Sequence, residues 1–144
     1  MDEILNFSKV FFPVYIRELL DSPIELEEGK PVLKIEVNNF IFRVRRIRVV
    51  AEVSDSREGS RWIDYTLQDG TGEIILRVWH NTSGTSTPLL ELENIYIIFG
   101  FFKEFKGFRY ISPIIVREYN RGDLEAWYQQ IELTRKAILK TLTV

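Results

Sequence analysis

Residues 69–81, with the sequence DGTGEIILRVWHN, constrain the fold of this chain more than any other stretch. A turn that contains two glycines leads into a strand, and successive side chains of a strand point to opposite faces. One face carries Ile74, Leu76 and Val78, and the other carries Ile75, Arg77 and Trp79. A strand covered on both sides is usually aliphatic throughout, and a solvent face seldom combines Trp with Arg. We therefore interpret this strand as the floor of a groove, with its aliphatic face in the core.

Other segments with the same alternation flank this strand. Residues 61–68 precede the turn at residues 69–72, which predicts an antiparallel hairpin. Residues 95–103 and 108–119 predict a second hairpin, whose tip carries the aromatic Phe105 between charged neighbours, where the ring either projects or folds back onto its own hairpin. With one further strand before residue 61, the chain has the strands for a small barrel.

The first strand-like region covers residues 33–53. Its apolar alternation shifts by one residue between Val44 and Ile47, which predicts a β-bulge at Arg45 or Arg46. A bulge bends a strand, and a long bent strand can take part in both sheets of a small, curved barrel. The remaining segments are predicted as connections, namely residues 25–30, 54–60 and 81–88, with one helical turn at residues 89–92.

Two helices are predicted at the two ends of the chain. A short helix within residues 10–20 begins near Pro13, and its apolar side consists of Ile16, Leu19 and Leu20. A longer helix follows Asp123, which is a favourable N-cap residue. Its apolar residues recur at spacings of three and four and form one seam, which consists of Leu124, Trp127, Ile131, Thr134, Ile138 and Leu142.

The long seam predicts a contact with another helix, because a barrel of five strands already covers its own core. We expect partner subunits to bind through Leu124, Trp127, Ile131, Ile138 and Leu142. The same surface would allow self-association when no partner is present. The alternative is that the helix packs against its own barrel. The expected organisation is a disordered N-terminus (1–12), a barrel domain (13–120) and a C-terminal oligomerisation helix (121–144).

Composition excludes several classes of site. The 144 residues contain no Cys and a single His, so disulfides, thiolate chemistry and His-based metal or triad sites are not expected. No apolar run approaches the roughly 20 residues that a membrane span needs. The net charge is −2, but basic residues gather in residues 43–48 and 103–121, which permits one basic surface on an acidic protein. We expect a cytoplasmic, nucleoid-associated protein without a cofactor.

Several motifs together carry a family resemblance. They are the Pro13, Ile16, Leu19, Leu20 segment, the Ile63-Asp64-Tyr65 strand with Asp69, the Arg77-x-Trp79 strand, the GFFKEF hairpin of residues 100–105 and a closing helix. Their order resembles the middle subunit of replication protein A and its telomere-capping relative of the Stn type. The resemblance implies an all-β fold, a five-stranded OB barrel with a short N-terminal and a long C-terminal amphipathic helix. The lack of a long tail and of a winged-helix domain resembles the short archaeal form.

The resemblance also implies a site for single-stranded DNA. The family's two stacking aromatics fall on Trp79 and Phe105, and basic positions beside them fall on Arg77 and Lys103. Lys106, Arg109 and Trp62 are further candidates for this site. One lysine of the family pattern is Thr66 here, which removes one expected phosphate contact. A larger replication protein A-type subunit, and a small one, are the partners that the resemblance implies for the C-terminal helix.

Three functions follow from these observations. The favoured one is a single-stranded DNA-binding subunit of a replication protein A-like complex in DNA replication, repair or recombination. The alternative is an interaction or scaffolding module, or an end-protection or RNA-binding protein, with little intrinsic nucleic-acid binding; a buried Trp79 ring would favour the scaffold. An enzyme is the least favoured, because Asp64, Asp69 and Glu73 are the only closely spaced acids near the groove.

Overall fold

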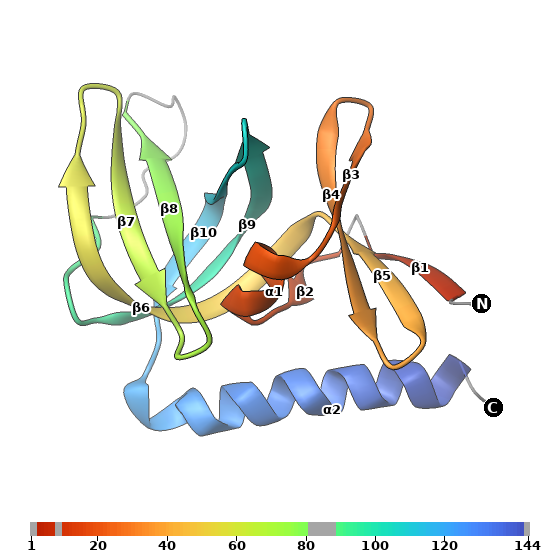
Figure 1. The fold of residues 1–144 in the computed structure, drawn as a ribbon. Helices are drawn as coiled ribbons and strands as arrows, with labels where there is room; N and C mark the ends of the chain where they lie inside the picture. Colours follow the sequence, from red (N-terminus) through yellow and green to blue (C-terminus); the bar gives the residue numbers. More distant parts are fainter. Residues whose placement is uncertain (1–2, 8–9, 81–88, 143–144) are drawn as a thin grey trace.

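The computed structural model describes residues 3–7, 10–80 and 89–142 (Figure 1). The strands are β1 (Glu3–Phe7), β2 (Phe12–Pro13), β3 (Ile24–Glu27), β4 (Lys30–Val37), β5 (Phe40–Val44), β6 (Arg46–Glu58), β7 (Trp62–Gln68), β8 (Glu73–Trp79), β9 (Ile95–Phe105) and β10 (Phe108–Glu118). The helices are α1 (Ile16–Asp21), the 3₁₀ helix η1 (Arg121–Asp123) and α2 (Leu124–Leu142). None of the helices in the described ranges is long and apolar enough to cross a membrane.

Five strands close a barrel in the order β6, β7, β8, β10, β9, and β9 returns to pair with β6. All of these pairings are antiparallel except β8 with β10, which is parallel. The barrel interior is mainly aliphatic, with Leu67, Leu76 and Ile98 fully buried, and it also contains the rings of Tyr65, Tyr96 and Phe102. Buried and outward side chains alternate along β7 and β8 as the sequence predicts. The predicted fold, a five-stranded OB barrel with a long C-terminal helix, is confirmed.

The close approach of β9 and β10 at this point of their antiparallel pairing depends on Gly100. A Cβ atom at this position would lie 2.4 Å from the backbone oxygen of Ser112, a distance that no real side chain tolerates. The register of the pair shifts between Pro113 and Ile115. Since a bulge increases the local bend of a strand, this irregularity and the glycine together let the hairpin curve around the barrel.

A second sheet, in the order β1, β5, β4, β3, lies beside the barrel (Figure 1). The sequence did not predict it, because residues 33–53 read as one strand. A turn at Asn38, whose φ is 50°, divides this region into the hairpin of β4 and β5. The alternation shift at Arg45 is real, but it marks the place where the chain leaves the small sheet at Val44 and enters the barrel at Arg46.

Other boundaries also differ from the expectation. Residues 3–7 form a strand parallel to β5, and Phe12–Pro13 pairs with β6, so these parts of the expected disordered N-terminus are ordered. The predicted loop at residues 54–60 is mostly strand, because β6 continues to Glu58 and pairs with β7. Residues 89–92 form no helical turn, and Leu90 packs into the barrel core instead. The predicted loop at residues 81–88 lies outside the described residues.

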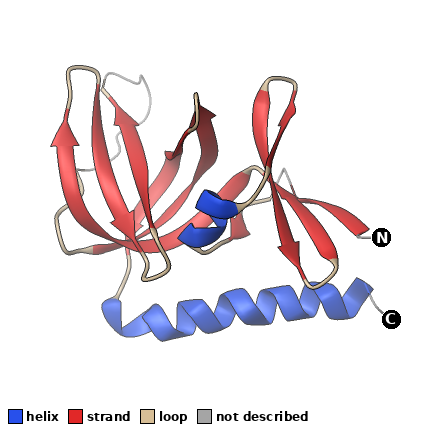
Figure 2. Cartoon of the chain, in the orientation of Figure 1, coloured by secondary structure: helices blue, strands red, loops and turns tan. Residues whose placement is uncertain are grey.

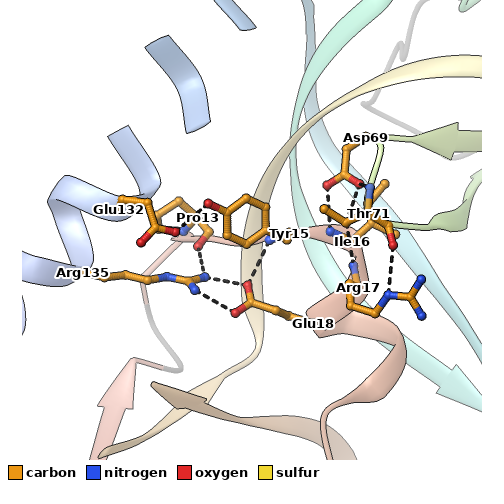
Figure 3. A network of polar contacts seen from close by, with 9 residues as sticks. All are labelled: Pro13, Tyr15, Ile16, Arg17, Glu18, Asp69, Thr71, Glu132 and Arg135. Atoms are coloured by element: carbon orange, nitrogen blue, oxygen red, sulfur yellow. Dashed lines mark hydrogen bonds and ion pairs between the residues drawn. The ribbon is translucent and has the colours of Figure 1, made fainter. Parts of the chain in front are cut away.

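Helix α1 closes one end of the barrel. It begins at Ile16 rather than near Pro13, and its backbone amide at Ile16 donates a 2.9 Å hydrogen bond to Asp69 Oδ2 in the β7–β8 turn (Figure 3). Ile16 and Leu19 are fully buried. The predicted apolar side of this helix is therefore part of the core, and the helix is fixed by the turn that precedes β8.

Helix α2 runs along one side of both sheets (Figure 2). Trp127 and Ile131 are 2% and 0% exposed, and they form a second apolar cluster with Val50 of β6 and Ile95 of β9. Leu124 packs against the same cluster, and Ile138 packs against the main core. The seam therefore covers the chain's own sheets, as the alternative stated, and Trp127 and Ile131 are core residues rather than a partner surface. The side chain of Leu142 lies outside the described residues.

The helix also starts differently from the expectation. Asn120, not Asp123, supplies the capping side chain, because its Oδ1 accepts a 2.9 Å hydrogen bond from the Gly122 amide at the start of η1. One turn of 3₁₀ helix then leads into α2. Short 3₁₀ turns at helix ends are common, since they satisfy backbone groups that the α-helix leaves without partners.

Candidate nucleic-acid interface

The outer face of β7 and β8 carries two tryptophans, at the start of β7 and at the end of β8. Trp62 and Trp79 are cross-strand partners, with ring centroids 4.8 Å apart and planes at 72°. Trp79 is 43% exposed. The ring is therefore accessible on the barrel surface, as a stacking role requires and as the scaffold alternative does not predict.

Arg77 lies at the centre of this face. Its guanidinium carbon is 4.0 Å from the centroid of the Trp62 ring, 5.0 Å from that of Phe108 and 5.3 Å from that of Tyr110. Its Nε and Nη2 each donate a 2.9 Å hydrogen bond to Asp64, and this pairing raises the pKa of Arg77. Arg77 is thus a fixed cation that holds the surrounding rings in place.

Phe105 sits at the tip of the β9–β10 hairpin and is 64% exposed. Lys106 and Gly107 form the turn with φ values of 51° and 84°, a conformation that favours glycine at the second position. The ammonium nitrogen of Lys106 is 5.3 Å from the Phe105 ring centroid. The ring and the charge therefore form one unit that projects from the barrel, as the resemblance implies.

Two aromatic residues of this face were not predicted. Phe108 is the cross-strand partner of Phe105, and Tyr110 is the partner of Lys103. The Phe108 and Tyr110 rings stack with centroids 5.4 Å apart and planes at 21°. The hairpin register and the two-residue spacing would have placed both on the face of Phe105. We define the aromatic face as Trp62, Arg77, Trp79, Phe105, Phe108 and Tyr110.

The basic candidates divide between the two sides of the sheet. Lys103 lies on the outer side, where burial, together with the charges of Arg45 and Lys30, lowers its pKa. Arg109 points to the opposite side, and its Nη1 donates 2.9 Å hydrogen bonds to three backbone oxygens at the end of α1, those of Leu19, Leu20 and Ser22. The assignment of Arg109 to the nucleic-acid site is therefore wrong, because the side chain caps a helix.

The acidic residues near the groove have structural partners. Asp64 binds Arg77, and Asp69 accepts hydrogen bonds from Ile16 and from the Thr71 amide and hydroxyl. Within the part of the chain that the structure describes, no group of three or more His, Cys, Asp or Glu residues could hold a metal ion. These carboxylates shape the turn and the aromatic face.

Comparison with known proteins supports the fold. A family model described as an OB-fold nucleic acid binding domain matches residues 47–113. No curated protein matches the sequence. A chain of a replication protein A heterotrimer bound to ssDNA is 19% identical with a TM-score of 0.70, and the match covers 90% of this chain and 98% of that chain.

Two further solved structures have the same arrangement. A chain of the S. pombe Stn1-ten1 complex is 15% identical with a TM-score of 0.73, covering 91% of this chain and 95% of that chain. A chain of yeast RPA bound to ssDNA is 21% identical with a TM-score of 0.66, covering 90% of this chain and 92% of that chain. Identities this low establish a shared architecture alone. The chain is an OB-fold domain with a long C-terminal helix, similar in structure to chains of replication protein A and of the Stn1-ten1 complex.

Proposed function

We propose that this chain binds single-stranded DNA through the aromatic face, as a subunit of a replication protein A-like complex in DNA replication, repair or recombination. The observation that carries the proposal is the set of three aromatic rings around the fixed cation Arg77, with Trp79 beside Trp62 and Phe105 opposite Phe108 on the same outer face of the barrel. Bases stack on aromatic rings for about 1–3 kcal/mol each, whatever their sequence. Lys103 and Lys106, beside these rings, supply charge for the phosphates.

The composition of the face favours binding without sequence preference. Among the residues that the structure describes, the face consists of aromatic rings and Arg77, with no amide side chain positioned to read a base edge. We therefore expect homopolymers to bind with similar affinities and duplex DNA to bind poorly. A strong preference for one short motif would favour an end-protection or RNA-binding role.

The assembly part of the proposal concerns the solvent side of α2. Leu133 is 65% exposed, and it lines an apolar pocket of about 410 Å³ between α2 and the segment before α1. The other lining residues are Tyr15, Tyr128, Gln129, Glu132 and Lys136. The structures with similar chains are multi-subunit complexes by name. A partner subunit would therefore dock here, on the face opposite to the buried seam.

The double variant Trp79→Ala with Phe105→Ala tests the proposal. Loss of two stacking rings should weaken binding of a fluorescently labelled oligo-dT by about 2–5 kcal/mol, or about 30- to 5,000-fold in Kd. Anisotropy at low salt measures this change. The matched control replaces two exposed leucines away from the face, Leu26→Ala with Leu89→Ala, and should bind as wild type does. Equal binding by the double variant and wild type would refute the assignment.

A further inference from the structure

A second group of rings and cations lies on the outer face of β6 and β9, around the barrel from the aromatic face. Arg46 of β6 is the cross-strand partner of Phe101 of β9, and Phe99 is two residues further along the same side of β9. Phe11, just before β2, meets Phe99 edge to face with centroids 5.6 Å apart. We define the arginine strip as Phe11, Arg45, Arg46, Phe99 and Phe101.

Three cations surround one ring of this strip. The guanidinium carbons of Arg45 and Arg46 lie 5.4 Å and 5.6 Å from the Phe101 ring centroid, and Lys103 Nζ lies 5.4 Å from it. Arg46 also lies 5.9 Å from the Phe11 ring. Contacts of this kind hold a guanidinium group against an aromatic ring at the surface.

Arg45, Arg46 and Lys103 concentrate positive charge in this region. Among the described residues, neither Arg45 nor Lys103 takes part in an ion pair, whereas Arg43, Arg77, Arg121 and Arg135 each bind a carboxylate. The lowered pKa of Lys103, caused first by burial and then by Arg45 and Lys30, reflects the same crowding of positive charge. A chain of net charge −2 thus keeps one local excess of cations, which an anionic ligand would relieve.

The strip continues directly from the aromatic face. Phe101, Lys103 and Phe105 alternate on the outer side of β9, so they follow one another in steps of about 6.7 Å. Tyr110 of the aromatic face is the cross-strand partner of Lys103, and Ser112 is the partner of Phe101. A single strand lying across Trp79 and Phe105 can therefore pass over Lys103 and reach Arg45 and Arg46 without leaving the surface.

We propose that the arginine strip is a second contact surface, where Arg45 and Arg46 bind phosphates of the same single strand after it has crossed the hairpin of β9 and β10. The inference rests on the proposed function and extends its footprint. The arginines of the strip act on the backbone, because guanidinium groups form paired hydrogen bonds with phosphate. Short oligonucleotides fill the aromatic face alone, and longer ones reach both surfaces.

The variant Arg45→Gln with Arg46→Gln tests this inference, with oligo-dT of about 4 and about 12 nucleotides as probes. Affinity for the short probe should stay at the wild-type value. Affinity for the long probe should fall, and the slope of log K against log salt should become shallower by about 1.4, since each lost phosphate contact removes about 0.7. The matched control is Arg117→Gln with Lys140→Gln, at exposed positions outside both surfaces, which removes the same charge elsewhere and should leave both measurements unchanged.

The outcomes separate this inference from the proposed function. If Trp79→Ala with Phe105→Ala abolishes binding but the double Gln variant keeps the wild-type salt slope on the long probe, the strip is not a contact surface and the proposed function stands. If the aromatic variant binds normally, the proposed function fails. If the double Gln variant instead loses only its partner subunit, the strip is a protein interface and the inference is overturned. If the double Gln variant has a lower melting temperature than wild type, the single variant Arg45→Gln replaces it in the test. The expected change in the slope of log K against log salt is then half as large.

Discussion

Two arginines show how strongly the role of a charged residue depends on its side of the sheet. Arg77 and Arg109 are both basic residues on barrel strands, and both were candidates for phosphate contacts. Arg77 lies outward, where Asp64 and three rings hold it. Arg109 lies on the other side and caps the end of α1. The two sides of the barrel strands therefore carry different roles, because the outward Arg77 belongs to the aromatic face and Arg109, on the other side, fixes α1.

Replacing Arg109 by Ala should lower the free energy of unfolding and leave DNA binding unchanged. Hydrogen bonds from a charged donor contribute about 1.5–3 kcal/mol, and this side chain satisfies three carbonyls that the helix end leaves open. Urea unfolding and oligo-dT anisotropy measure the two effects. Lys106→Ala is the converse control, since it should weaken binding and keep the unfolding energy. Weakened binding by a stable Arg109→Ala variant would contradict the capping role.

Tyr15 predicts how stability depends on alkaline pH. Burial first, and then its 2.7 Å hydrogen bond to Glu132, raise the pKa of Tyr15 to about 12. An unfolded tyrosine ionises near pH 10, so above about pH 10 the unfolded chain binds fewer protons than the folded chain. The stabilising contribution is complete below about pH 10 and is lost as the pH rises to about 12.

The variant Tyr15→Phe should remove this part of the alkaline destabilisation. Urea unfolding at several pH values between about 9 and 12 should give a shallower decline for the variant than for wild type, because Phe has no proton to lose. Below pH 9 the two curves should run parallel. Identical slopes over the whole range would show that Tyr15 ionises equally in the folded and unfolded chains.

At the scale of elements, a buried ion pair ties the two helices together. Arg135 of α2 is 6% exposed, and it donates hydrogen bonds of 2.7 Å and 2.6 Å to Glu18 of α1 and one of 3.0 Å to the Pro13 carbonyl (Figure 3). Asp69 fixes α1 from its other side. Helix α2, helix α1 and the β7–β8 turn are thus joined through polar contacts as well as apolar packing.

Replacing Arg135 by Met should destabilise the fold by about 3–5 kcal/mol, because the change leaves the Glu18 carboxylate with no cation in a partly buried place. Adding Glu18→Gln should restore part of the loss, so the double variant should be more stable than the sum of the two single changes predicts. Thermal unfolding of the three variants measures the coupling. Strict additivity would show that the pair contributes no specific interaction.

At the scale of the whole molecule, α2 has a buried side and an exposed side. Ile131→Asp places a charge in the cluster with Val50 and Ile95 and should unfold the chain. Leu133→Asp, two residues away on the exposed side, should keep the fold and abolish binding of a co-expressed partner subunit. Circular dichroism and co-purification measure the two effects. Retention of the partner by Leu133→Asp would refute the docking surface on α2.

The sequence predicted the barrel well because its strands show strict alternation. Both faces of β8, the hairpin tip at Phe105 and the exposed Trp79 follow from that local pattern. It did not predict the second sheet, because the turn at Asn38 interrupts an otherwise continuous apolar run, and because β1 is defined only by parallel pairing with distant β5.

The missing sheet explains why the buried seam of α2 was assigned to a partner subunit. The periodicity of the helix identified its apolar residues correctly. Periodicity alone does not show which surface packs against those residues. The main core, against which Ile138 and Leu139 pack, includes Leu33 and Phe42 of the second sheet. With that sheet unrecognised, the helix had more apolar surface than the barrel could cover, and a partner seemed necessary.

The position of α2 after every strand that the structure describes also governs when part of the core is covered. Trp127 and Ile131 close the cluster over Val50 and Ile95, so this surface stays uncovered until α2 has left the ribosome. Until then the growing barrel exposes an apolar stripe beside unpaired strand edges, a combination that promotes aggregation. Strand pairings such as β6 with β9 also join residues far apart in the chain, which slows folding. Packing of α2 over Val50 and Ile95 therefore follows the synthesis of every strand that the structure describes.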